Sequence, residues 1–149
     1  MAKIYEDKSK YLNSRLQFQN LSKNANAIIK EFGVSLNYRG FVEVMTSYMR
    51  TDDSTSISEL EDLLKSFTFW IEYLGDVKTL ILYYKNHFEI QVDCAKDENK
   101  KIEYKNKFFI LKQYEKSLQK QETLFNKAYK DLMFQRGEKL KKYMRVTED

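Results

Sequence analysis

Residue types that interrupt or cross-link a chain are scarce in this sequence. Its 149 residues include no proline, four glycines and one cysteine, whereas average usage of about 5% would give roughly seven prolines. Few such residues means few tight turns, so we expect long helices joined by short connections. A β-sandwich or a doubly wound α/β fold is disfavoured, and a single all-α domain over residues 1–149 is predicted.

Long apolar runs are missing as well. No segment approaches the ~20 apolar residues that a membrane-spanning helix needs, and the opening stretch MAKIYEDKSKY is no secretory signal. The lone Cys94 excludes an intramolecular disulfide and a thiolate metal cluster, so the cytoplasm is the expected compartment. Richness in Lys, Asn, Tyr, Phe and Ile is typical of AT-rich genomes. We therefore also consider a phage or mobile-element accessory protein, located inside a virion or host cell.

Apolar residues, by contrast, recur every seven positions in two long segments, as expected for coiled-coil-like helices. The first ladder is Leu60, Phe67, Leu74, Ile81, Phe88 and Ala95, and the second is Tyr104, Leu111, Leu118, Phe125 and Leu132. Folded as an antiparallel hairpin, the two ladders face each other, with arms at residues 56–97 and 100–145. Facing pairs such as Ile81 with Leu118 are all centred between Asn99 and Lys100, so the fold point is predicted there, and asparagine tolerates the left-handed turn conformation.

One continuous helix is the alternative, since Ile102 and Phe109 extend the first ladder. The companion ladder that starts at Leu63 turns polar from Gln91 onward, however, so one side of the apolar stripe would be lost. The pattern therefore favours the hairpin.

Two shorter helices are predicted within residues 1–50. A ladder of Ile4, Tyr11, Phe18, Ala25 and Phe32 indicates the first helix, which Gly33 can end, and the second covers about Tyr38 to Met49. TDDSTS at residues 51–56 reads as a loop, and Ser56 or Ser58 can cap the first arm of the hairpin. Gly75 inside that arm predicts a kink or a close helix crossing.

Chemistry-bearing residues form no recognisable catalytic pattern. His87 and Cys94 are seven apart, but no base and orienting acid accompany them, so we expect a surface histidine and a semi-buried cysteine. The acid pairs Glu72 with Asp76 and Glu89 with Asp93 lack the Glu-x-x-His motif of a metal-binding bundle. We expect no enzyme activity, catalytic residue, metal, cofactor or small-molecule substrate.

Charge is unevenly placed although the net value is only +4. Residues 56–97 carry four basic and eight acidic residues, whereas residues 98–149 carry fourteen and eight. We expect the acidic arm to lie beside the basic arm, with basic residues facing the acid pairs.

Two candidate surfaces follow from these patterns. The first arm is aromatic nearly all round, which is typical of a helix buried on several sides or of an interface. Its candidate partner interface consists of Phe69, Tyr73, Leu80 and Tyr83. The basic end of the second arm is a candidate nucleic-acid site, formed by Arg136, Lys139, Lys141, Lys142 and Arg145.

The hypothesis that best fits these features is a non-catalytic subunit for protein–protein interaction or assembly, self-associating or bound to a larger complex. The alternative is an accessory protein that binds nucleic acid through the basic C-terminal helix.

Overall fold

A computed structural model describes residues 8–148 of the chain, with side chains described for residues 15–144. In chain order the elements are α2 (Lys8–Ile29), a 3₁₀ turn (Lys30–Phe32), α3 (Tyr38–Met49), α4 (Ile57–Cys94) and α5 (Glu98–Glu148), and no strand occurs over this range. The all-α prediction is confirmed, and α3 has the predicted bounds.

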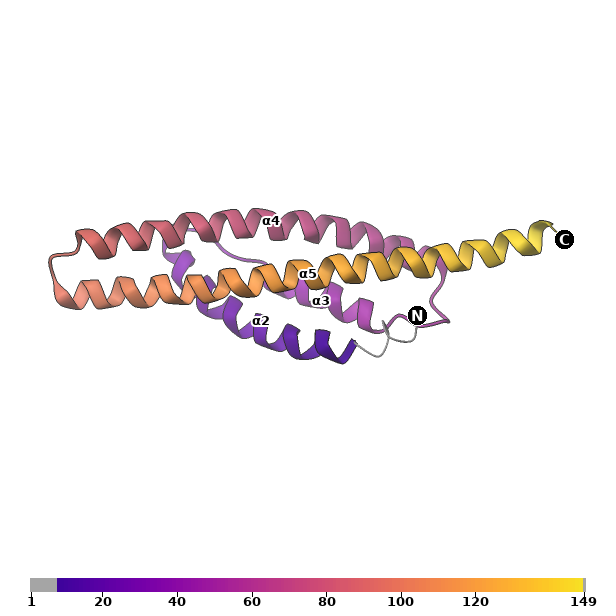
Figure 1. Cartoon of the computed structure of the whole chain (residues 1–149), viewed down its shortest axis with the longest axis horizontal. Coiled ribbons are helices and arrows are strands. Elements are labelled where there is room, and N and C mark those ends of the chain that lie inside the picture. The colour runs from indigo at the N-terminus through magenta and orange to yellow at the C-terminus, as the bar shows by residue number, and fades with distance from the viewer. Residues whose placement is uncertain (1–7, 149) are drawn as a thin grey trace.

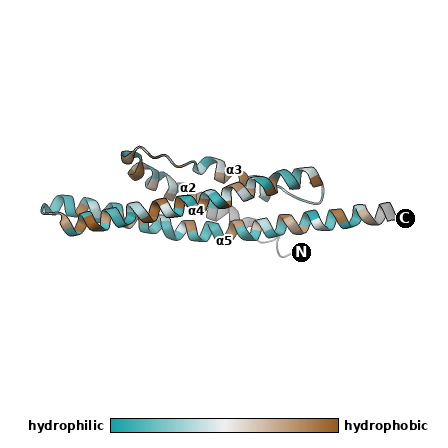
Figure 2. Ribbon diagram, turned by 90° about the horizontal axis from the view of Figure 1, so that it is seen from above, coloured by the Kyte–Doolittle hydropathy of each residue, from teal (hydrophilic) through white to brown (hydrophobic). Residues whose placement is uncertain are grey.

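The two longest helices form the predicted antiparallel hairpin (Figure 1). Helices α2 and α3 lie together on one side of it, with α2 mainly against α5 (Figures 1 and 2). A continuous helix is thereby ruled out. Both apolar ladders face inward, and their most buried members are Leu60, Phe67, Ile81, Leu111, Phe125 and Leu132.

The position of the turn differs from the prediction. The chain reverses over residues 95–97, and Ala95 is extended, with φ −70° and ψ 128°. Asp97 caps the start of α5, since its side chain accepts a hydrogen bond from the Asn99 N–H at 3.0 Å and its carbonyl accepts one from the Lys101 N–H at 2.9 Å. Among the described residues only Gly33 has a positive φ, so Asn99 is helical and the predicted left-handed turn there is wrong.

The predicted helix ends were better placed elsewhere. Gly33 adopts the left-handed conformation, with φ 77°, and its N–H is bonded to the Lys30 carbonyl. Of the two serines considered, Ser56 caps α4: its side chain accepts from the Glu59 N–H, and the Glu59 carboxylate accepts from the Ser56 N–H. This reciprocal capping box satisfies two backbone donors that the helix leaves unpaired.

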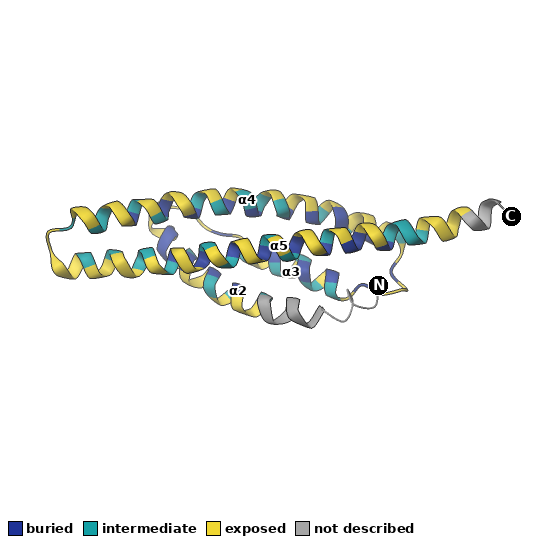
Figure 3. Cartoon of the chain, in the orientation of Figure 1, coloured by how far each residue is buried: buried dark blue, intermediate teal, exposed yellow. Residues whose placement is uncertain are grey.

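An aromatic centre joins four helices in the core. Phe41 of α3 stacks on Phe125 of α5 with ring centroids 4.1 Å apart, and Phe125 meets Phe67 of α4 at 4.8 Å. Phe18 of α2 completes the group against Phe41 at 4.9 Å. Buried residues concentrate where the helices overlap, and the hairpin tip is mostly exposed (Figure 3). The N-terminal helices therefore anchor the middle of the hairpin and leave its tip uncovered.

A buried polar cluster ties α5 to the end of α3. The Tyr48 hydroxyl donates to the Asp131 carboxylate at 2.7 Å, and the Gln135 amide donates to the same carboxylate oxygen at 3.1 Å. Gln135 also reaches the Thr51 hydroxyl at 3.3 Å. Hydrogen bonds of this kind fix the position of α5 relative to the loop that follows α3.

Glycine placement corrects one expectation. A Cβ atom added at Gly75 would meet nothing within 4 Å, so no helix crosses closely there, and α4 runs through this position unbroken. The close approach is at Gly40, where a Cβ would lie 2.6 Å and 2.8 Å from two ring atoms of Trp70. Gly40 therefore lets α3 pack directly on the indole of α4.

The N-terminal ladder is only partly a core ladder. Phe18 and Ala25 are buried, whereas Phe32 lies in the 3₁₀ turn and remains half exposed against Tyr84. The side chains of Ile4 and Tyr11, the first members of the ladder, lie outside the described residues.

Candidate interaction surfaces

The predicted interface residues lie on one outer face of α4, and we call this set the α4 outer face: Phe69, Tyr73, Leu80 and Tyr83. Their spacing places them within an arc of about 80° at 3.6 residues per turn. Phe69 is 60% exposed and Tyr83 is 67% exposed, whereas Tyr73 and Leu80 are half-buried against the core. The face therefore has two exposed aromatic ends and a partly covered middle.

The covered middle is held by the segment that precedes α3. The Asn37 N–H donates a hydrogen bond to the Tyr73 hydroxyl at 2.8 Å. The Tyr73 ring in turn stacks on Phe69, with centroids 6.5 Å apart, and Phe69 meets Trp70 edge-on at 5.1 Å. These contacts restrain the Phe69 ring although it is exposed.

Phe32 extends this face in a way that the sequence did not suggest. It stacks on Tyr84 at 4.5 Å and meets His87 edge-on at 5.4 Å. The heptad spacing placed Phe32 in the ladder of the first predicted helix, and such spacing cannot show that this helix tightens into a 3₁₀ turn at its end.

The acidic arm lies beside the basic arm as predicted, but the ion pairs described between them are not the expected ones. Lys85 of α4 pairs with Glu115 of α5 at 2.6 Å, and Lys78 of α4 pairs with Glu122 of α5 at 3.7 Å. Both lysines come from the acidic arm and both glutamates from the basic arm. Glu72, Asp76, Glu89 and Asp93 are exposed, and within the described range no ion pair joins them to α5.

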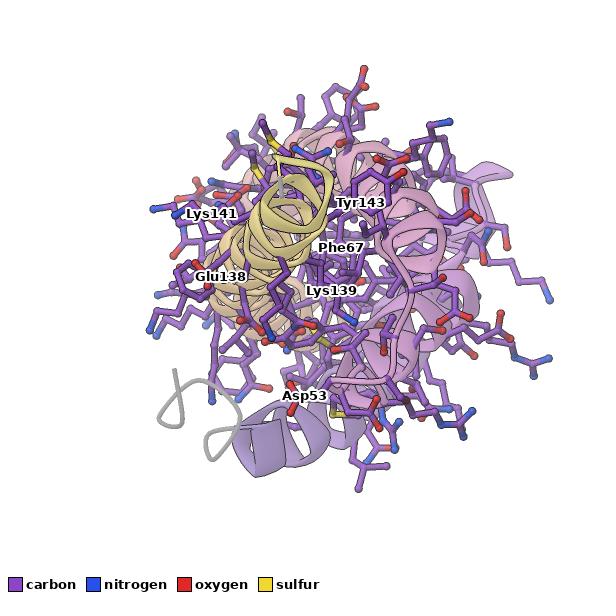
Figure 4. All side chains as sticks on the ribbon, turned by 90° about the vertical axis from the view of Figure 1, so that its right-hand side faces the viewer. Asp53, Phe67, Glu138, Lys139, Lys141 and Tyr143 are labelled. Carbon is purple, nitrogen blue, oxygen red and sulfur yellow. The ribbon has the colours of Figure 1, made fainter. Side chains whose placement is uncertain are left out.

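The predicted basic cluster at the end of α5 does not form one face. The Lys139 ammonium donates to the backbone carbonyls of Asp53, at 2.9 Å, and Thr55. Lys141 lies on the other side of the helix beside Glu138, 3.7 Å away (Figure 4). Arg136 is half-buried and Lys142 is exposed. The side chain of Arg145 lies outside the described residues.

A more regular basic surface lies earlier on α5. Seven lysines fall within an arc of about 100° over residues 101–130, a row about 44 Å long at 1.5 Å per residue. We call this row the lysine stripe: Lys101, Lys105, Lys112, Lys116, Lys120, Lys127 and Lys130. All are exposed except Lys101, which is half-buried. The same spacing count that found the ladders could have found this stripe.

Lysines off the stripe behave differently. Lys107 bonds the Glu31 carboxylate at 3.1 Å and lies 3.4 Å from Glu103. Burial lowers the pKa of Lys107, but hydrogen bonds and charge from Glu31 and Glu103 outweigh it and leave that pKa above its ordinary value. No ion pair is found for any stripe lysine within the part of the chain whose side chains are described.

The residues considered for catalysis are dispersed. His87 packs edge-on against Phe32 and Phe88, and Cys94 is exposed in the last turn of α4, so the predicted semi-burial of Cys94 is wrong. Over the described residues, no three His, Cys, Asp or Glu side chains gather where they could hold a metal ion. Nor is any helix in that range both long and apolar enough to cross a membrane.

Comparison of the chain with protein-family models, curated proteins and solved structures gives no match.

Proposed function

We propose that this protein is a non-catalytic interaction or assembly subunit, and that a helix of a partner protein docks on the α4 outer face. The observation that carries this proposal is the exposure of Phe69 and Tyr83, on a helix whose other large aromatics are mostly packed. Exposed Phe and Tyr are typical anchors of protein interfaces, because they bury a large area at a small cost in conformational entropy.

The geometry of this face suits a helix as the partner. Phe69 and Tyr83 are two heptads apart, about 21 Å along α4, and Tyr73 and Leu80 fill the interval with half-buried apolar surface. A second helix laid along this row would contact all four side chains. Phe69 is already restrained by Tyr73 and Trp70, which reduces the entropy lost on binding.

The charges on α4 favour a different protein over a second copy of this chain as the partner. Glu72 and Asp76 are exposed on the same side of α4. In a symmetric antiparallel contact between two copies, with Phe69 opposite Tyr83, Asp76 of one copy would face Asp76 of the other. Like charges facing each other in an interface are unfavourable. We therefore favour a partner helix that carries apolar anchors with basic residues between them.

The test compares matched charge substitutions on α4. Phe69→Glu and Tyr83→Glu place a carboxylate on the α4 outer face. Leu82→Glu places one at an exposed apolar position on another side of the same helix, because Leu82 is 44% exposed. Circular dichroism and thermal unfolding determine whether each of the three variants folds like the wild type.

Binding is then measured in two ways. Sedimentation equilibrium determines whether the wild type self-associates, and partners captured from the source organism are purified and titrated against each variant. We expect Phe69→Glu and Tyr83→Glu to weaken binding about 30-fold or more, as for interface anchors, and Leu82→Glu to bind as the wild type does. Equal binding by all variants contradicts the proposal, and unfolding of Phe69→Glu alone assigns Phe69 to the core.

Nucleic-acid binding is the second candidate, and the lysine stripe is the observation that favours it. The cluster predicted for this role, residues 136–145, is less suitable because Lys139 holds the loop before α4 and Arg136 is half-buried. Residence in the cytoplasm, or in a virion or host cell, also belongs to the proposal, and imaging of a tagged chain would test it.

A further inference from the structure

We propose that the lysine stripe of α5 binds the phosphate backbone of double-stranded nucleic acid without reading its sequence. The site is separate from the α4 outer face and from the C-terminal residues considered above. It consists of the seven lysines between Lys101 and Lys130 and needs no other element of the fold.

The distribution of acids along α5 supports this assignment. Three acids lie on α5 between Lys101 and Lys130 and none of them falls within the arc of the stripe. Each is instead paired with a lysine off the stripe: Glu103 with Lys100 and Lys107, Glu115 with Lys85, and Glu122 with Lys78. Lysines off the stripe thus neutralise these three glutamates, and the positive charge of the stripe lysines is not offset by acids within the arc.

The other residues in the arc argue against a membrane surface or a single-stranded nucleic acid as the ligand. They are Ile102, Phe109, Gln119 and Thr123, and the two apolar residues both lie near the hairpin tip. An amphipathic helix that enters a membrane surface needs an apolar face along its length, which this arc lacks. Binding to single strands normally uses several aromatic side chains as stacking platforms, and here Phe109 is the sole aromatic within the arc.

Shape favours a duplex. The stripe is a straight, narrow row about 44 Å long on a helix about 10–12 Å across, and one turn of B-DNA is about 34 Å long with a major groove about 12 Å wide. A straight helix cannot follow a groove that winds around the duplex axis. We therefore expect about three to five of the seven lysines to contact phosphates at once, which gives a slope of log K against log[salt] of about −2.7 to −4.5.

Lysine is suited to this kind of contact. Its ammonium group is a point charge on a flexible stem, so it meets phosphate oxygens without the fixed bidentate geometry by which arginine reads guanine. The stripe contains no arginine. Contacts to phosphate alone position a protein on a duplex and carry no sequence information.

The experiment uses the full chain and fluorescence anisotropy of labelled 30-nucleotide probes, double-stranded or single-stranded, in two unrelated sequences. We expect the duplexes to bind with equal affinity regardless of sequence and more tightly than the single strands. Between about 50 and 200 mM salt the affinity for duplex should fall about 40- to 500-fold, as the slope above requires.

Two variants with the same change in net charge separate the stripe from overall charge. The stripe variant replaces Lys105, Lys112, Lys116 and Lys120 with Gln, which preserves helix propensity. The control variant replaces the exposed lysines Lys23, Lys30, Lys65 and Lys96 with Gln. We expect the stripe variant to lose at least about 10-fold in affinity and to have a shallower salt slope, and the control variant to keep most of its affinity.

Several outcomes would overturn the proposal. Absence of duplex binding at 50 mM salt would do so, as would equal losses in the stripe and control variants, which indicate a net-charge effect. A loss confined to a Lys141→Gln, Lys142→Gln double variant would move the site to the C-terminal end. Single-strand binding that depends on Phe109, or binding to phosphatidylserine vesicles but not to duplex, would replace the duplex with another ligand.

Discussion

The two arms of the hairpin share one inner surface and have opposite outer surfaces. Inside, α4 and α5 both present heptad ladders of large apolar residues to the same core. Outside, α4 presents Phe69 and Tyr83 among acids, whereas α5 presents a row of lysines. The ion pairs between the arms use the minority charges, lysines of the acidic arm and glutamates of the basic arm. The majority charges of each arm are thus left for the solvent or for partners.

The largest expected difference in unfolding free energy is between substitutions on the inner and outer faces of α5. Phe125→Ala removes a fully buried ring that stacks on Phe41 and contacts Phe67, and it should cost about 3–5 kcal/mol of unfolding free energy. Phe109→Ala removes a ring that is 57% exposed and should change stability by less than about 0.5 kcal/mol. Urea denaturation followed by circular dichroism measures both, and similar losses would contradict the assigned faces.

A smaller change in stability is expected at two glycines, Gly40 of α3, which packs on α4, and Gly75 within α4. Gly40→Ala forces a methyl group against the Trp70 ring and should destabilise the fold by about 1–3 kcal/mol. Gly75→Ala adds a methyl group to open space inside a helix and should stabilise it by about 0.5–1 kcal/mol. Thermal unfolding midpoints should therefore shift in opposite directions. A neutral Gly40→Ala variant would mean that α3 does not press on the indole.

The smallest effect concerns the charges between the arms. Lys85 and Glu115 are both largely buried and 2.6 Å apart, so a double-mutant cycle with Lys85→Gln and Glu115→Gln should give a coupling of about 0.5–1 kcal/mol. The exposed pair of Lys141 and Glu138, 3.7 Å apart, should give about 0–0.5 kcal/mol in the same cycle. Equal coupling in the two cycles would show that burial between the arms adds nothing to this ion pair.

Local patterns predicted most of the fold, because helices are specified by spacing and by their ends. The ladders, the Gly33 end and the Ser56 cap each depend on residues close in sequence. The turn was misplaced because the polar residues Lys96 to Lys101 suit both a loop and the exposed first turn of a helix, so their polarity does not show where the loop ends. The Asp97 cap decides between the two, because it starts the helix at Glu98, two residues before the predicted start of the second arm at residue 100.

The surfaces were less predictable because they depend on distant segments. Spacing identified the face that contains Phe69 and Tyr83, but it could not show that Asn37 binds the Tyr73 hydroxyl and half covers the middle of this face. Composition marked Lys139 as part of a basic cluster, whereas the loop carbonyls of Asp53 and Thr55 hold it. Spacing alone could have predicted the lysine stripe, but the prediction was based on the local density of basic residues, which is higher near the C-terminus.

The short turn at residues 95–97 has a mechanical consequence. Helix α4 begins and helix α5 ends toward the end of the molecule opposite that turn (Figure 1). Tension applied between these two points would load the contacts in sequence rather than together. The Lys139 contacts with the loop would give way first, then Leu132 and Phe125, and the hairpin would open like a zipper toward its tip. A hairpin pulled in this direction yields at low force, whereas the same hairpin pulled along its axis from opposite ends would have to shear the whole apolar seam at once.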